Sequence, residues 1–247
     1  MNRTDFIIPQ TVLEHIEGTP LYYPCSGRDT LGAVKLFAPF VNDFLFVDIG
    51  YYTNHTQMRV PSPKDIPGFV LISRKREGPP RAEMVEKYDE VKKEYYQDME
   101  PCIVTETYFH EPTGKTIKFR LKRGFAEYTL KHIENKIGVF YYRGDGNGEG
   151  GSGITWLGKK RMNLICDKLI DGGLIVTDGS NGSRNHKQFR KYHNHRDNEE
   201  SRDEMMKTMT PFKDTKGRTF TCVGYGGERY GPTFIWQVHK QKGGKIE

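Results

Sequence analysis

Two short, uninterrupted apolar segments near the N-terminus most constrain the fold of this chain. Residues 21–23 (Leu-Tyr-Tyr) are stopped by Pro24, and residues 44–47 (Phe-Leu-Phe-Val) end at Asp48. Between them, residues 30–37 carry apolar side chains at helical spacing. Strands that are apolar at every position are buried on both faces, which is typical of a parallel sheet covered by helices. The order strand–helix–strand therefore predicts an α/β fold.

The same alternation continues along the chain. Further apolar strands are expected at residues 69–73, 138–142 and 174–177. Helices are expected at residues 82–98, 125–135 and 154–170, the last of them ended by Asp171-Gly172-Gly173. Two pairs of β-forming segments predict hairpins, at residues 103–109 with 116–121 and at residues 220–225 with 233–239. Together these elements predict a doubly wound, mostly parallel sheet with helices on both faces and an antiparallel C-terminal hairpin.

Length and hydropathy bound the organisation. A chain of 247 residues suits one sizeable α/β domain better than two. We therefore expect a single domain over residues 1–247, with a β-hairpin insertion at about residues 101–122 and a basic polar insertion at about residues 181–218. No apolar run approaches the roughly 20 residues that span a bilayer, and residues 1–10 lack the apolar segment of a signal peptide. We therefore expect a cytoplasmic protein without a membrane partner. The sequence does not determine its oligomeric state.

The cysteines and the charge balance narrow the chemistry. Four cysteines lie far apart with no Cys-x-x-Cys pair: Cys25, Cys102, Cys166 and Cys222. Neither a disulfide framework nor a structural zinc site is therefore expected, and we predict no metal. The 38 basic and 32 acidic residues give a formal net charge of +6. This charge is compatible with a polyanionic partner without requiring one.

The first strand–turn–helix segment is the strongest candidate for a ligand site. Ser26-Gly27 would let a ligand approach the backbone between the strand and the helix, and Asp48 ends the next strand. In an open α/β sheet, ligands bind beyond the carboxyl ends of the strands. A carboxylate at that edge suits the two hydroxyls of a ribose. The alternative interpretation is a tight turn and a surface aspartate with no ligand.

These residues resemble the first two motifs of class I S-adenosylmethionine-dependent methyltransferases. Residues 23–29 are similar to a variant of the first motif, with one glycine where the family usually has two or three. Residues 44–48 look like the second motif. The resemblance covers about 150 residues and implies a Rossmann-like fold with S-adenosylmethionine as the small-molecule cofactor. The residues that it implies for the cofactor pocket are Tyr23, Pro24, Ser26, Gly27, Asp29 and Asp48.

A loop at residues 143–153 contains six glycines in eleven residues. It follows an apolar strand, where the resemblance implies catalytic and substrate-binding residues. Asp145 and Glu149 are expected to orient an amino or cationic acceptor or to act as general bases. Arg143 is expected to hold a phosphate or carboxylate. The alternative is a flexible surface loop, and the match of residues 146–151 to the dinucleotide fingerprint is weak because glycine is so frequent there.

Other polar segments have two interpretations each. Residues 184–218 contain ten Lys or Arg against six Asp or Glu. They are interleaved with the aromatic residues Phe189, Tyr192 and Phe212. This mixture fits a nucleic-acid contact through charge and stacking, or else a solvated helix or lid. Residues 74–76 and 118–123 add basic surface with the same two alternatives. Residues 177–182 form a polar loop after a strand, which is either part of the site or a simple turn.

Two functions of different classes remain open from the sequence. The leading hypothesis is an enzyme that binds S-adenosylmethionine and transfers its methyl group to an acceptor that the sequence does not identify. The alternative is a catalytically inactive methyltransferase-like fold that acts as a nucleic-acid- or protein-binding module. Two features favour this alternative: the basic residues at 184–218, and the absence of the Asn/Asp-Pro-Pro-aromatic motif of amino-group methyltransferases. Another nucleotide-using enzyme on the same fold is a third possibility.

Overall fold

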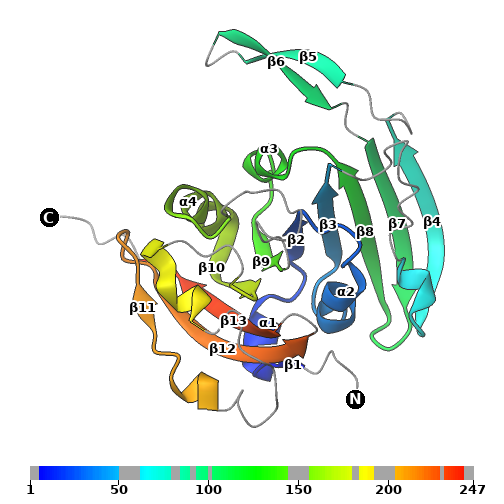
Figure 1. The fold of residues 1–247 in the computed structure, drawn as a ribbon. Helices are drawn as coiled ribbons and strands as arrows, with labels where there is room; N and C mark the ends of the chain where they lie inside the picture. The colour runs from blue at the N-terminus through cyan, green and yellow to red at the C-terminus, as the bar shows by residue number, and fades with distance from the viewer. Residues whose placement is uncertain are drawn as a thin grey trace, which may run out of the picture. The chain divides into compact units, whose positions relative to one another are not determined.

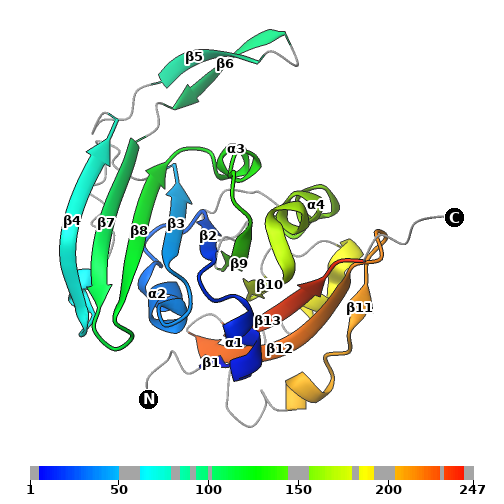
Figure 2. The same cartoon turned by 180° about the vertical axis from the view of Figure 1, so that it is seen from behind.

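The computed structural model describes residues 6–49, 62–78, 84–89, 93–99, 102–143, 156–179, 184–191, 204–228 and 231–241 (Figures 1 and 2). They contain β-sheet with both parallel and antiparallel strand pairs, together with helices, which confirms the α/β class. The chain divides into two compact units. One contains Met1–Leu21 and Ile133–Glu247, and the other contains Tyr22–His132. The expected single domain with two insertions therefore stays a prediction.

Five strands of the Tyr22–His132 unit follow one another in the order β2-β3-β8-β7-β4. Their bounds are β2 (Pro20–Pro24, whose first two residues belong to the other unit), β3 (Asp43–Asp48), β8 (Lys115–Arg123), β7 (Cys102–His110) and β4 (Phe69–Glu77). The helices of this unit are α2 (Leu31–Phe37), η1 (Pro63–Asp65) and α3 (Ala126–Lys131). Strand β8 runs parallel to β3, whereas β7 is antiparallel to both β8 and β4.

The apolar strands β2 and β3 form the core of this unit, as the sequence predicts. Every residue of β2 after Pro20 is buried, and so are the four central residues of β3. The Phe46 ring packs against Tyr23 and Phe119, at centroid distances of 5.9 and 4.9 Å. The buried Tyr22 hydroxyl has a hydrogen-bond partner, because it donates to the Ala126 carbonyl at 2.6 Å. These contacts hold the end of β2 in a fixed place.

The hairpin predicted from residues 103–109 and 116–121 is confirmed as β7 and β8. Burial alternates along both strands, so one face of the pair is internal and the other meets solvent. The Arg120 guanidinium makes two hydrogen bonds of 2.7 Å with the Asp43 carboxylate. This two-pronged ion pair joins β8 to β3 and helps to fix their parallel register.

The helix predicted over residues 82–98 is wrong. The segment contains two strands, β5 (Met84–Asp89) and β6 (Glu94–Met99), which pair antiparallel as a separate sheet. Lys93 in the turn has a φ of +57°, a left-handed conformation that an α-helix cannot contain. The abundant Glu and Lys favour a helix only weakly, by tenths of a kcal/mol per residue, and strand pairing overrides that preference.

The other unit contains strands in the order β9-β10-β13-β12-β1, with β11 also paired to β12. Their bounds are β9 (Ile137–Tyr142), β10 (Leu169–Thr177), β13 (Gly231–His239), β12 (Thr219–Glu228), β1 (Phe6–Ile7) and β11 (Phe212–Lys213). The helices are α1 (Gln10–His15), α4 (Lys159–Lys168) and η2 (Arg184–Arg190). Strands β9 and β10 are parallel, and β13 is antiparallel to β10 and β12, which confirms the C-terminal hairpin.

The mostly parallel arrangement is confirmed only in part. The pairs β3–β8 and β9–β10 are parallel, whereas β4–β7, β7–β8, β5–β6, β10–β13, β12–β13, β1–β12 and β11–β12 are antiparallel. The difference arises at the outer strands, where sequence neighbours such as β7 and β8 join by tight turns. Such turns can connect only antiparallel strands.

Residues 171–173 do not end a helix, contrary to the sequence prediction. Helix α4 ends at Lys168, and β10 begins at the next residue and runs through these positions. The pairing with β9 shifts between Leu169 and Leu174, so the glycines form a bulge within the strand. Gly172 has a φ of +73°, and a Cβ there would lie 2.4 Å from the His15 ring. Both the backbone and the close packing require glycine.

Two aromatic residues of the basic segment pack in one aromatic cluster. Phe189 of η2 is 3% exposed and packs edge-on against Phe212, Phe220 and Trp236, with centroids 5.2–5.8 Å apart. Phe189 cannot therefore stack on nucleic-acid bases as the sequence interpretation proposed, and Phe212 is largely committed to the same cluster. Trp156 and Trp236 are fully buried. Tyr192 lies outside the described residues.

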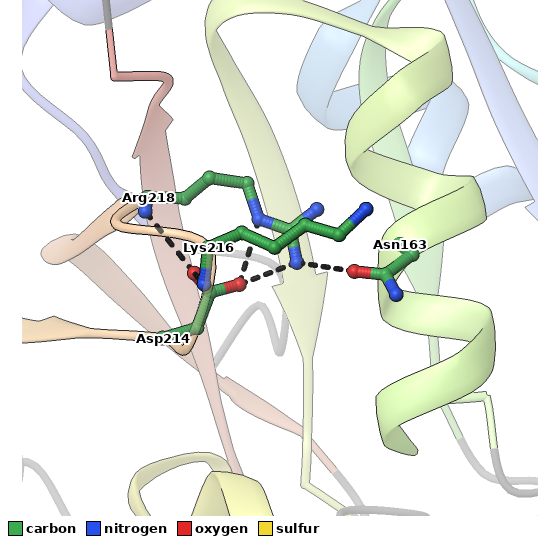
Figure 3. Close-up of polar contacts among 4 residues, drawn as sticks. All are labelled: Asn163, Asp214, Lys216 and Arg218. Atoms are coloured by element: carbon green, nitrogen blue, oxygen red, sulfur yellow. Dashed lines mark hydrogen bonds and ion pairs between the residues drawn. The ribbon is translucent and has the colours of Figure 1, made fainter. Parts of the chain in front are cut away.

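A buried ion pair attaches the turn before β12 to α4 (Figure 3). Arg218 Nε donates to Asp214 Oδ2 at 2.6 Å, and its Nη2 bridges Asp214 and Asn163 Oδ1, the latter at 2.8 Å. The amides of Lys216 and Arg218 donate to Asp214 Oδ1. Burial alone would raise the pKa of Asp214, but these hydrogen bonds and the Arg218 charge outweigh it and hold the pKa below its usual value.

We expect the Asp214 contribution to stability to be lost in acid. A lowered folded-state pKa stabilises the protein fully above the ordinary carboxyl pKa of about 4, and the benefit disappears as the pH falls through the folded-state value. Asp214→Asn should lower the free energy of unfolding by about 3 kcal/mol at pH 7, because it leaves Arg218 buried without its counter-charge. Urea unfolding from pH 7 down to pH 3 measures this difference, which should shrink below pH 4. The exposed Asp167→Asn is the control, and a difference independent of pH would contradict the assignment.

Candidate functional site

The turn between β2 and α2 has an unusual backbone. Cys25 and Gly27 both have positive φ, at 52° and 51°. The Asp29 amide donates to the Ser26 carbonyl at 2.9 Å, which closes the turn one residue before Thr30 and the start of α2. The sequence predicts the bend at Ser26-Gly27 but not the left-handed Cys25, because a cysteine gives no signal for that conformation.

The turn is in direct contact with Asp48. The amide of Gly27 donates to Asp48 Oδ2 at 3.0 Å, between residues 21 apart in the sequence. Asp48 is the last residue of β3, as predicted, and is partly exposed. The structure therefore brings together the two groups that the sequence hypothesis requires at one place.

A second carboxylate lies at the same turn. The Tyr23 hydroxyl, from a side chain 1% exposed, donates to Asp29 Oδ2 at 3.1 Å. Ser26 and Pro24 are buried beside it, so the predicted cofactor residues other than Asp48 lie in one short segment. Arg28 of the turn is exposed, and Arg123 of β8 is the register partner of Asp48, so both charge signs are present at this edge. The two carboxylates can accept hydrogen bonds from hydroxyls.

The residues predicted for catalysis are only partly described. Asp145 and Glu149 lie outside the described residues. Arg143 belongs to the Ile133–Glu247 part of the other unit, is 4% exposed, and donates from Nε to Thr233 Oγ1 at 2.9 Å. Nearby in the same unit, the Gly179 amide donates to Thr177 Oγ1 at 3.0 Å, so this part of residues 177–182 forms a turn.

A buried polar cluster on β7 escapes the sequence analysis. The Tyr108 hydroxyl donates to Glu106 Oε2 at 2.5 Å, and Ser62 Oγ lies 2.9 and 2.6 Å from the same two groups. Arg74 pairs with Glu106 at 3.4 Å. Burial, followed by the bond to Glu106, raises the pKa of Tyr108, which therefore stays neutral. The sequence feature that could have revealed this cluster is the period-two spacing of Glu106, Tyr108 and His110, which places them on one face of a strand.

Two features are absent from the part of the chain that the structure describes. Among the residues that the structure describes, no three His, Cys, Asp or Glu side chains are grouped to hold a metal ion. None of the described helices has the length and apolar character to cross a membrane.

Comparison with known proteins gives weak structural likenesses. No protein-family model matches the chain, and no curated protein matches it. A methyltransferase candidate from Streptococcus mutans, solved in complex with SAH, superimposes at a TM-score of 0.38 and 10% identity, covering 92% of this chain and 94% of that one. Precorrin 8W decarboxylase from Methanobacterium thermoautotrophicum gives a TM-score of 0.33 and 13% identity, covering 91% and 84%.

The left-handed Cys25 allows a test of the turn. Cys25→Gly should leave the free energy of unfolding within about 1 kcal/mol of the wild type, because relief of the left-handed strain offsets the greater freedom of the unfolded chain. Cys25→Val should lower it by about 2 kcal/mol, because a β-branched residue is strongly disfavoured at positive φ. Urea unfolding of the two variants makes the comparison. Equal stability of the Gly and Val variants would mean that the turn differs in solution.

Proposed function

We propose that this chain binds S-adenosylmethionine at the β2–α2 turn and Asp48. The contact between Gly27 N and Asp48 Oδ2 carries the proposal, because it joins a backbone bend to a carboxylate at the ends of neighbouring strands. Strands β3 and β8 are parallel, so this edge is the carboxyl edge of both, where α/β sheets bind their ligands.

Each proposed cofactor residue has a distinct role. Asp48 would accept hydrogen bonds from the ribose hydroxyls while it holds the Gly27 amide. Ser26 and Gly27 would let the ligand approach the main chain, and Tyr23 and Pro24 would form the apolar wall at the end of β2. Asp29, held by the Tyr23 hydroxyl, would face the positive end of the cofactor.

Charge distinguishes this cofactor from other nucleotides. S-adenosylmethionine carries a sulfonium and an ammonium group, whereas dinucleotides present a pyrophosphate. Asp29 is bonded to the Tyr23 hydroxyl and Asp48 to the Gly27 amide. A carboxylate about 4 Å from a phosphate would cost on the order of 1 kcal/mol even in water. The same carboxylates attract a cation.

For a transfer function, the bound cofactor would supply an electrophilic methyl group. The protein would then need mainly to align an acceptor and to take up one proton. Arg143 is proposed to hold a phosphate or carboxylate of the acceptor, and its bond to Thr233 gives its side chain a fixed direction. Asp145 and Glu149 complete the proposal as acceptor-orienting carboxylates.

The corresponding fold proposal is a methyltransferase-like Rossmann arrangement, doubly wound with helices on both faces. The parallel pairs β3–β8 and β9–β10 support it, as does the late strand β13 running antiparallel beside β10. The proposed alternative, an inactive binding module, loses one of its supports. Phe189 is buried in the core, so the basic segment at 184–218 lacks one of the stacking residues proposed for nucleic acid.

Asp48→Asn tests the cofactor site. The asparagine can still accept from Gly27 N but has lost its charge and one acceptor oxygen, so the affinity for S-adenosylmethionine should fall at least tenfold. A hydrogen bond to a charged group contributes about 1.5–3 kcal/mol. Isothermal titration calorimetry with S-adenosylmethionine and SAH measures the loss.

The matched control is Asp65→Asn, which removes one exposed carboxylate in the same unit. It should bind like the wild type, and both variants should melt within a few degrees of it. Unchanged affinity in Asp48→Asn removes Asp48 from the site. Absence of binding by the wild type, with NAD bound instead, would favour another nucleotide enzyme.

A further inference from the structure

The solvent-facing side of the β7–β8 hairpin is a separate surface of this protein. Along each strand every second residue is buried, so the intervening residues share the opposite face. Register pairs Thr107 with Lys118 and Thr105 with Arg120. We define the outer face by six residues of these two strands: Thr105, Thr107, Phe109, Lys118, Arg120 and Lys122.

The structure sorts the basic residues of this region into internal and external groups. Arg123 is fully buried and faces inward, and Arg74 pairs with the buried Glu106. Lys118, Arg120 and Lys122 point outward instead, at every second position along β8. A two-residue step along a strand is about 6.8 Å, so these three cations form a regular row.

The neighbouring strand β4 extends this surface. It lies beside β7 (Figure 1), and its Lys75 pairs in register with Thr105 and is 75% exposed at the side chain. Lys75 contacts Glu77 at 2.7 Å, and Arg120 contacts Asp43. The outer face with Lys75 presents four cationic side chains.

An aromatic residue and hydroxyls lie among these cations. Phe109 is 40% exposed, although most large apolar side chains of the described strands are buried. It faces Val70 of β4 in register, itself 49% exposed. Thr105 and Thr107 place hydroxyls between the lysine row and Lys75. A sheet face with cations, hydroxyls and an exposed ring offers partners for phosphates, sugars and one base plane.

We propose that the outer face binds single-stranded nucleic acid. The cation row would follow the phosphates, and Phe109 would stack on a base, which only an unpaired strand can present. The phosphates of a duplex could contact the cations, but its paired bases could not stack on Phe109. An anionic membrane would contact the cations without stacking on the ring or bonding to the threonine hydroxyls. This surface is distinct from the proposed cofactor site and does not depend on it.

Fluorescence anisotropy with labelled 20-nucleotide oligo-U and oligo-dT tests the proposal on the full chain. The double variant Lys118→Glu/Lys122→Glu should weaken binding at least tenfold at 50 mM salt. It should also lower the slope of log affinity against log salt by about 1.4, at about 0.7 per lost phosphate contact on a single strand. Phe109→Ala should weaken binding about tenfold with an unchanged slope, because stacking is not ionic.

Lys159→Glu/Lys160→Glu on α4 makes the same charge change at exposed positions elsewhere and should bind like the wild type. All variants should keep the wild-type melting temperature. Their affinity for S-adenosylmethionine should equal that of the wild type, whether or not the wild type binds it. An equal loss in the α4 variant would show a general charge effect and overturn the proposal. So would undetectable binding by the wild type, or tighter binding to duplex or to phosphatidylserine vesicles than to either oligonucleotide.

Discussion

The hydrogen bond from the Gly27 amide to the Asp48 carboxylate is the contact on which the functional account depends. It connects the turn after β2 to the last residue of β3, and both are anchored by core contacts. The buried rings of Tyr23 and Phe46 hold the two strands, and the positive φ of Cys25 and Gly27 aims the amide. A change in any of these would alter the distance between bend and acid.

Sequence patterns predict the buried centre of the fold well. Continuous apolar runs identify β2, β3 and β9 because burial on both faces leaves no room for polar residues. Alternation identifies β7 and β8 for the converse reason, since one side meets water. The position of Asp48 at the end of β3 follows from the continuous apolar run before it. The carboxylate of the candidate site can therefore be predicted from the sequence.

The sequence-based predictions that failed did so for physical reasons. The strands β5 and β6 have the composition of a helix, and only pairing between them decides their conformation. Gly172 and Gly173 look like a helix stop, but a bulge in β10 needs the same residue type. The cluster of Glu106, Tyr108 and Ser62 depends on the packing of η1 against β7, which no local pattern encodes. Likewise, only the register separates the inward Arg123 from the outward Lys122.

A crystal structure of the full chain grown with millimolar SAH is the most direct measurement. The account predicts both ribose hydroxyls within hydrogen-bond distance of the Asp48 carboxylate, with the adenosine against the main chain of Ser26 and Gly27. SAH seated anywhere else, or Asp48 turned away from the bend with the ligand bound, would contradict it.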